Sequence, residues 1–76
     1  MQQVRVTRMA AKRGAVECYE DSNNTYTIFE RGGRVWIEAY APGGAKRSMP
    51  QVNSVEEARE YILHRNDRKG HPISFF

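Results

Sequence analysis

Along the first half of the chain, apolar segments are separated by short polar ones in a pattern typical of β-strands joined by turns. Segments rich in β-branched and aromatic residues are separated by clusters of Gly, Pro, Asn, Asp and Ser, which favour turns. A short segment between Pro42-Gly43-Gly44 and Pro50 can form a further strand. The pattern predicts strands over Gln3–Met9, Ala15–Glu20, Thr25–Glu30 and Arg34–Tyr40, with a fifth over Lys46–Met49.

Beyond residue 53 the apolar positions change to helical spacing. Ser54 and Glu57 match a capping box, in which Ser54 accepts from the Glu57 backbone N–H and Glu57 accepts from the Ser54 N–H. The predicted helix ends between residues 65 and 69, with Gly70 directly after its C-cap. The apolar positions of this helix are Val55, Ala58 and Ile62.

Together these elements predict an α+β fold. Residues 1–76 form a single domain, in which an antiparallel meander of four to five strands carries one C-terminal helix packed on one face. The apolar tail over residues 71–76 is expected to dock as an edge strand or under the helix.

Gly32-Gly33 predicts a two-residue hairpin turn, because such turns need positive φ angles. That turn sets Phe29 opposite Trp36 and gives the hairpin an aromatic and basic face. The other face is aliphatic and is the better partner for the helix. It carries Tyr26, Ile28, Glu30, Val35, Ile37 and Ala39.

The second strand does not fit this division without a further feature. Continued without interruption, it sets Val16 and Cys18 on the aromatic face and Tyr19 on the helix face. Two explanations remain open at this point: either a β-bulge shifts the register, or Phe75 and Phe76 cover part of the aromatic face.

Charge is unevenly distributed, although the net charge is only +3. Residues 1–14 contain cations and no acid, whereas residues 15–30 contain acids and no cation. The first and third turns of a meander share one end of the sheet. We expect that end to carry Lys12, Arg13, Arg31 and Arg34.

Several classes of protein do not fit the sequence. The longest apolar run is far below the ~18 residues of a membrane span, and no signal peptide is visible. Cys18 is the only cysteine and allows no internal disulfide. The spacing of histidines and carboxylates predicts no metal site. We therefore expect a cytoplasmic, non-enzymatic binding protein without cofactor or metal.

An aromatic face flanked by cations predicts binding of nucleic acid or of a nucleic-acid-handling protein complex, because bases stack on rings while Arg and Lys contact phosphates. The alternatives are that Phe29 and Trp36 belong to the core, or that the face binds a protein. The protein is expected to be a monomer or a homodimer. The candidate binding residues are Lys12, Arg13, Phe29, Arg31, Arg34, Trp36, Tyr40, Lys46 and Arg47.

The order of sheet and helix over residues 24–66 resembles the small N-terminal DNA-binding domains of phage-type integrases. The matching features are two strands, a basic return strand over residues 43–48, and Ser54-Val55-Glu56-Glu57-Ala58 at the start of the helix. The resemblance implies a sheet that docks on DNA. The chain departs from the family by two additional N-terminal strands.

The chain is also similar, as a class, to short phage and mobile-element proteins, among them anti-CRISPR proteins. That likeness implies the alternative function, inhibition of a host defence complex through protein–protein binding.

Overall fold

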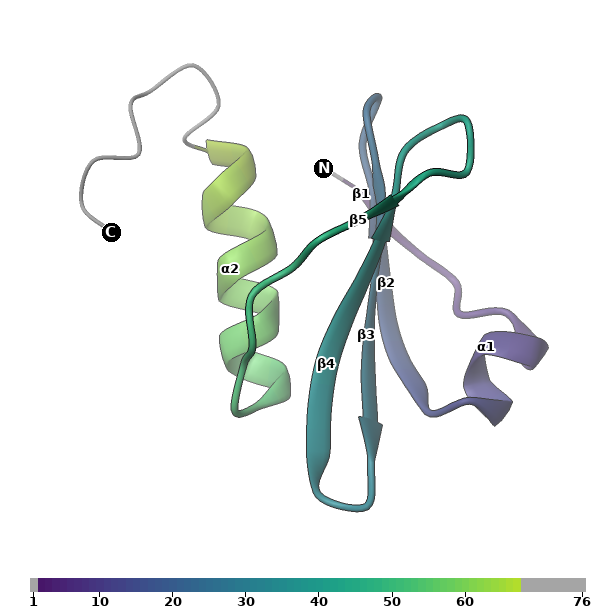
Figure 1. Cartoon of the computed structure of the whole chain (residues 1–76), viewed down its shortest axis with the longest axis vertical. Coiled ribbons are helices and arrows are strands. Elements are labelled where there is room, and N and C mark those ends of the chain that lie inside the picture. Colours follow the sequence, from purple (N-terminus) through teal and green to yellow (C-terminus); the bar gives the residue numbers. More distant parts are fainter. Residues whose placement is uncertain (1, 68–76) are drawn as a thin grey trace.

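A five-stranded antiparallel sheet in the order β1-β2-β3-β4-β5 separates two helices (Figure 1). The computed structural model describes residues 2–67. Helix α2 lies on one side of the sheet and the short helix α1 on the other. The predicted α+β meander with a C-terminal helix is thereby confirmed. The elements are β1 (Gln2–Val4), α1 (Arg8–Lys12), β2 (Ala15–Glu20), β3 (Thr25–Arg31), β4 (Arg34–Tyr40), β5 (Lys46–Arg47) and α2 (Val55–Asp67).

The hairpin of β3 and β4 has the predicted register. Gly32 and Gly33 have φ angles of 59° and 82°, a conformation that residues with a Cβ rarely adopt. The turn sets Arg31 opposite Arg34 and Phe29 opposite Trp36. One face of this hairpin is therefore aromatic and basic, as the sequence predicts.

A β-bulge in β2 accounts for Val16 only, since Cys18 opposite Thr27 and Tyr19 opposite Tyr26 keep the faces that an uninterrupted strand gives them. Ala15 pairs with Phe29 and Glu17 pairs with Ile28, so Val16 is an additional residue without a partner in this ladder. Val16 is 43% exposed and is thus removed from the aromatic face. The bulge was one of the two explanations left open. The other, a cover formed by Phe75 and Phe76, lies outside the described residues.

The hydrophobic core lies between the sheet and α2. Ile28, Ala39 and Ala58 are fully buried, and Ile62 is 1% exposed. The aliphatic face of β3 and β4 therefore packs against α2, as predicted.

The start of α2 is capped largely as predicted. The Glu57 backbone N–H donates to Ser54 Oγ at 3.0 Å. The Glu57 carboxylate, however, accepts from the Asn53 backbone N–H rather than from that of Ser54. The helix ends at Asp67, within the predicted range, whereas Gly70 lies outside the described residues.

The predicted strand over Gln3–Met9 is wrong beyond Val4. Pairing with β2 ends at Val4 and Cys18, and Thr7 then caps α1 by accepting from the Ala10 N–H at 3.2 Å. Arg, Met, Ala and Lys have high helix propensity, so the local preference of residues 8–12 is helical. The predicted fifth strand is also shorter, because only Lys46 and Arg47 pair with β4.

Candidate nucleic-acid interface

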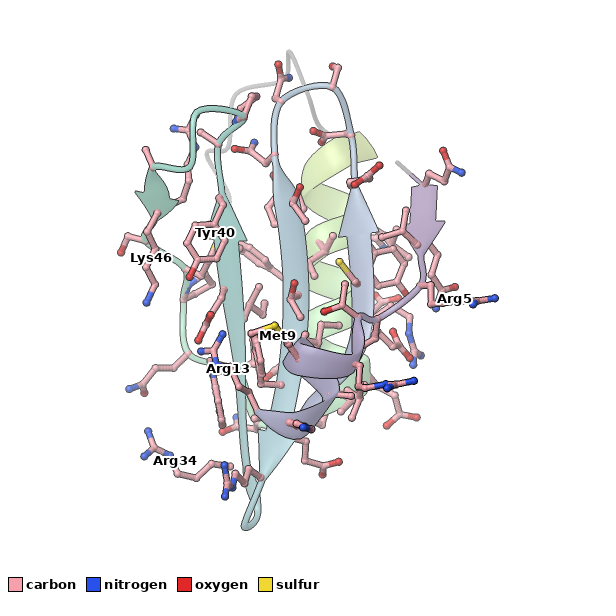
Figure 2. All side chains as sticks on the ribbon, turned by 90° about the vertical axis from the view of Figure 1, so that its right-hand side faces the viewer. Arg5, Met9, Arg13, Arg34, Tyr40 and Lys46 are labelled. Atoms are coloured by element: carbon pink, nitrogen blue, oxygen red, sulfur yellow. The ribbon has the colours of Figure 1, made fainter. Side chains whose placement is uncertain are left out.

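A groove of about 770 Å³ runs beside the open edge of β4. One wall consists of residues 33–38 and the other of residues 46–53. The groove exists because β5 pairs with β4 only at Ala39 and Tyr40, so the edge from Arg34 to Glu38 has no neighbouring strand within residues 2–67. Figure 2 shows Arg34 and Lys46 along this edge.

Four of the predicted binding residues line this groove. Arg34 and Trp36 come from β4, and Lys46 and Arg47 come from β5. The Arg47 guanidinium donates through Nε to the side-chain oxygen of Asn24 at 2.8 Å, which orients it. The groove therefore combines three cations with one partly buried indole.

Glu38 is the one acid in the groove lining, and its charge is compensated. Its carboxylate accepts from Arg13 Nη2 at 2.8 Å, from Trp36 Nε1 at 3.1 Å and from the Tyr40 hydroxyl at 3.2 Å. The residue is only 8% exposed. We call Glu38 with these three donors the Glu38 cluster.

The environment of Glu38 keeps its carboxyl ionised. Burial alone would raise its pKa, but the hydrogen bonds from Trp36, Arg13 and Tyr40 and the charge of Arg13 outweigh burial. The pKa of Glu38 is therefore lowered from the ordinary value. An ionised Glu38 is paired with Arg13, which lies outside the groove lining, and no other lining residue is an acid.

Phe29 has a different position from the one that its candidate role requires. It is 2% exposed, its ring stacks on Trp36 at 5.2 Å between centroids, and the Arg13 guanidinium lies 4.8 Å from its centroid. A ring so enclosed has no free face for a base. Phe29 packs against one face of the Trp36 ring and does not itself contact a ligand.

The remaining candidates lie outside the groove lining. Lys12 is exposed at the end of α1, and Arg31 is exposed beside the hairpin turn. These two ends are neighbours, because the Gly14 carbonyl accepts from the Glu30 backbone N–H at 2.9 Å. The end of α1 that carries Lys12 and the hairpin end that carries Arg31 therefore lie side by side. Arg13 belongs to that end but is paired with Glu38.

Sequence reasoning missed the Glu38 cluster. The alternation of Trp36, Glu38 and Tyr40 on one face of a strand was available as a signal, since residues two apart in a strand share a face. The link to Arg13 was not available, because it joins residues 25 apart in the chain. It also missed Asn24, which orients Arg47.

On the other side of the sheet, an ion pair joins α2 to β2. Arg59 donates to both carboxylate oxygens of Glu17, and the Tyr19 hydroxyl donates to the same carboxylate at 2.7 Å. The hydrogen bond from Arg59 is the main reason that the pKa of Glu17 is lowered. This contact fixes the helix on the sheet and is remote from the groove.

Comparison with protein families, with curated proteins and with solved structures found no match. Within residues 2–67, no helix has the length and apolarity to cross a membrane, and no three His, Cys, Asp or Glu side chains are arranged to hold a metal ion. Cys18 lies half-buried with its sulfur 3.5 Å from the Thr27 hydroxyl. The groove is therefore the feature of residues 2–67 that points to a function.

Proposed function

We propose that this protein is a cytoplasmic, non-enzymatic binding protein that binds single-stranded nucleic acid. The site is the groove between residues 33–38 and residues 46–53, which we call the β4–β5 groove. The observation that carries the proposal is the lining of that groove. Arg34, Lys46 and Arg47 line the groove together with one partly exposed aromatic side chain, Trp36, and the single acid among the lining residues is paired with Arg13. Proteins that bind single strands combine a cationic groove with rings on which bases stack.

Each group has a distinct part in this proposal. The cations contact phosphates, with Arg47 already oriented by Asn24. The indole N–H of Trp36 is occupied by Glu38, so the residue offers ring surface rather than a hydrogen bond to a base. Stacking of this kind accepts every base, and we expect weak sequence preference. The volume of about 770 Å³ is within the range of ligand sites.

The test is fluorescence anisotropy of a labelled oligothymidine at several salt concentrations. Arg34→Ala should weaken binding and reduce the salt slope by roughly 0.7, the value for one phosphate contact on a single strand. The matched control is Arg5→Ala, which removes the same charge at the opposite edge of the sheet (Figure 2). Equal effects of the two variants would mean that binding follows net charge and not the groove, and would contradict the proposal.

The open edge of β4 favours a second candidate, a protein partner. In the hairpin register, the backbone groups of Val35 and Ile37 point away from β3 and toward the groove. An extended segment of another protein could pair there as an added strand, as an inhibitor of a larger complex would. In that case oligothymidine does not bind, and association with the partner depends weakly on salt.

A further inference from the structure

Helix α1 presents an apolar side chain to solvent. It buries none of its residues, and Met9 is 79% exposed, the highest value among the large apolar side chains of residues 2–67. Figure 2 shows Met9 in front of the sheet, on the side of the molecule where Arg13, Arg34 and Lys46 also lie. The helix therefore displays Met9 on the face that borders the groove.

Contacts at the C-terminal end of α1 fix the position of this short helix on the sheet. At its C-terminal end, Arg13 pairs with Glu38 and lies over the ring of Phe29. The next residue, Gly14, has a φ of 108° and approaches β3 so closely that a Cβ would lie 2.9 Å from the Glu30 carbonyl oxygen. Arg13 thus attaches α1 to β4, which forms one wall of the groove, and Gly14 attaches it to β3 beside that wall.

The surroundings of Met9 are cationic. Arg8 and Lys12 lie on α1 and are exposed, and Arg5 precedes the helix. The chain contains no acid before Glu17. Single exposed apolar residues are common on soluble proteins. An apolar side chain with cations before and after it on the same short helix is complementary to a polyanion with an apolar surface at its centre.

A duplex of nucleic acid has that character, since its phosphates enclose stacked bases. Proteins insert Met and other apolar side chains between or against base pairs while Arg and Lys hold the flanking phosphates. Met is suited to this because its side chain is unbranched and adaptable.

We infer that the ligand is a duplex with a single-stranded extension. The extension lies in the β4–β5 groove, Met9 packs against the last base pair of the duplex, and Arg8 and Lys12 contact the duplex phosphates. This inference rests on the proposed function, since it takes the groove as the site of the single strand. It adds the position of the protein on the nucleic acid, at the boundary between paired and unpaired regions.

The test compares three labelled probes by anisotropy: an oligothymidine, a blunt duplex, and the same duplex with the oligothymidine as its tail. The tailed duplex should bind roughly tenfold more tightly than either other probe, because packing of Met9 against the last base pair adds to groove binding. Met9→Ala should remove this advantage and leave oligothymidine binding unchanged. Met9→Leu, which keeps an apolar side chain, should preserve most of it.

The outcomes separate this inference from the proposed function. If the oligothymidine binds and the tail brings no gain over it, the inference fails and the groove remains supported. The inference also fails if Met9→Ala weakens binding of the oligothymidine and the tailed duplex equally. If no probe binds, both proposals fail. Because Met9 is exposed, these substitutions should leave the melting temperature unchanged, which serves as the folding control.

Discussion

On the α2 side of the sheet, Ile28, Ala39 and Ile62 are at most 1% exposed and pack in an apolar layer. On the α1 side, the buried groups include the carboxylate of Glu38, which is 8% exposed and accepts three hydrogen bonds. Apolar burial is non-directional and depends little on pH, whereas a buried carboxylate is stable only while its donors remain in position. The α2 side thus provides stability, and the α1 side fixes the geometry of the groove.

The largest loss of stability is expected from a substitution within the apolar layer between the sheet and α2. Ile62→Ala should lower the free energy of unfolding by about 2–5 kcal/mol, because it removes buried methyl groups and leaves a cavity. Urea melts at pH 7 and at pH 4 should give the same difference from the wild type. A loss below about 1 kcal/mol would show that α2 contributes little to the core.

A smaller loss of stability is expected from a substitution in the Glu38 cluster, on the α1 side of the sheet. Glu38→Gln removes the negative charge that pairs with Arg13, so the hydrogen bonds from Arg13 and Trp36 become weaker, while the Tyr40 hydroxyl can accept from the new amide group. We expect a loss of about 1–3 kcal/mol in urea melts. Glu20→Gln is the control, since Glu20 is an exposed carboxylate at the end of β2. Equal stability of the two variants would contradict the role of the Glu38 cluster.

The loss of stability in Glu38→Gln should depend on pH, whereas the loss in Ile62→Ala should not. The pKa of Glu38 is lowered in the folded state, mainly by donors that outweigh burial, so its contribution is complete above the unfolded value near 4.5. It is lost as the pH falls through the folded pKa. The difference between wild type and Glu38→Gln should therefore shrink on acidification, whereas that for Ile62→Ala should not. Parallel curves for both variants would refute this account.

The smallest effect concerns the start of α2. Ser54→Ala removes the oxygen that accepts from the Glu57 N–H and should cost about 1 kcal/mol. The control is Ser48→Ala, at an exposed position outside the helix. Urea melts that do not separate the two variants would show that water replaces the cap without loss.

Features that depend on neighbours in the chain could be predicted from the sequence. The register of Phe29 and Trp36 follows from Gly32-Gly33, and the start of α2 follows from Ser54 and Glu57. In both cases the residues that determine the conformation are adjacent to it. The boundary between strand and helix near Thr7 could not be predicted with the same rules, because a strand pattern and a short helix compete over those residues.

The candidate site was predictable only in part, for a related reason. Alternation along β4 correctly brings Arg34 and Trp36 to one face. Whether a ring on that face is accessible depends on what covers it, and Arg13 reaches Phe29 from a helix that the pattern did not predict. The groove itself results from the shortness of β5, which pairs at only two positions.

Each strand from β2 to β5 pairs with the strand that precedes it in the chain. Folding rates rise when contacts join residues close in sequence, so each hairpin can form with little loss of loop entropy. The ion pair between Glu17 and Arg59 joins residues 42 apart and needs both the sheet and α2. We therefore expect the meander to form first and this contact to form late, so that substitutions at Arg59 accelerate unfolding more than they slow refolding.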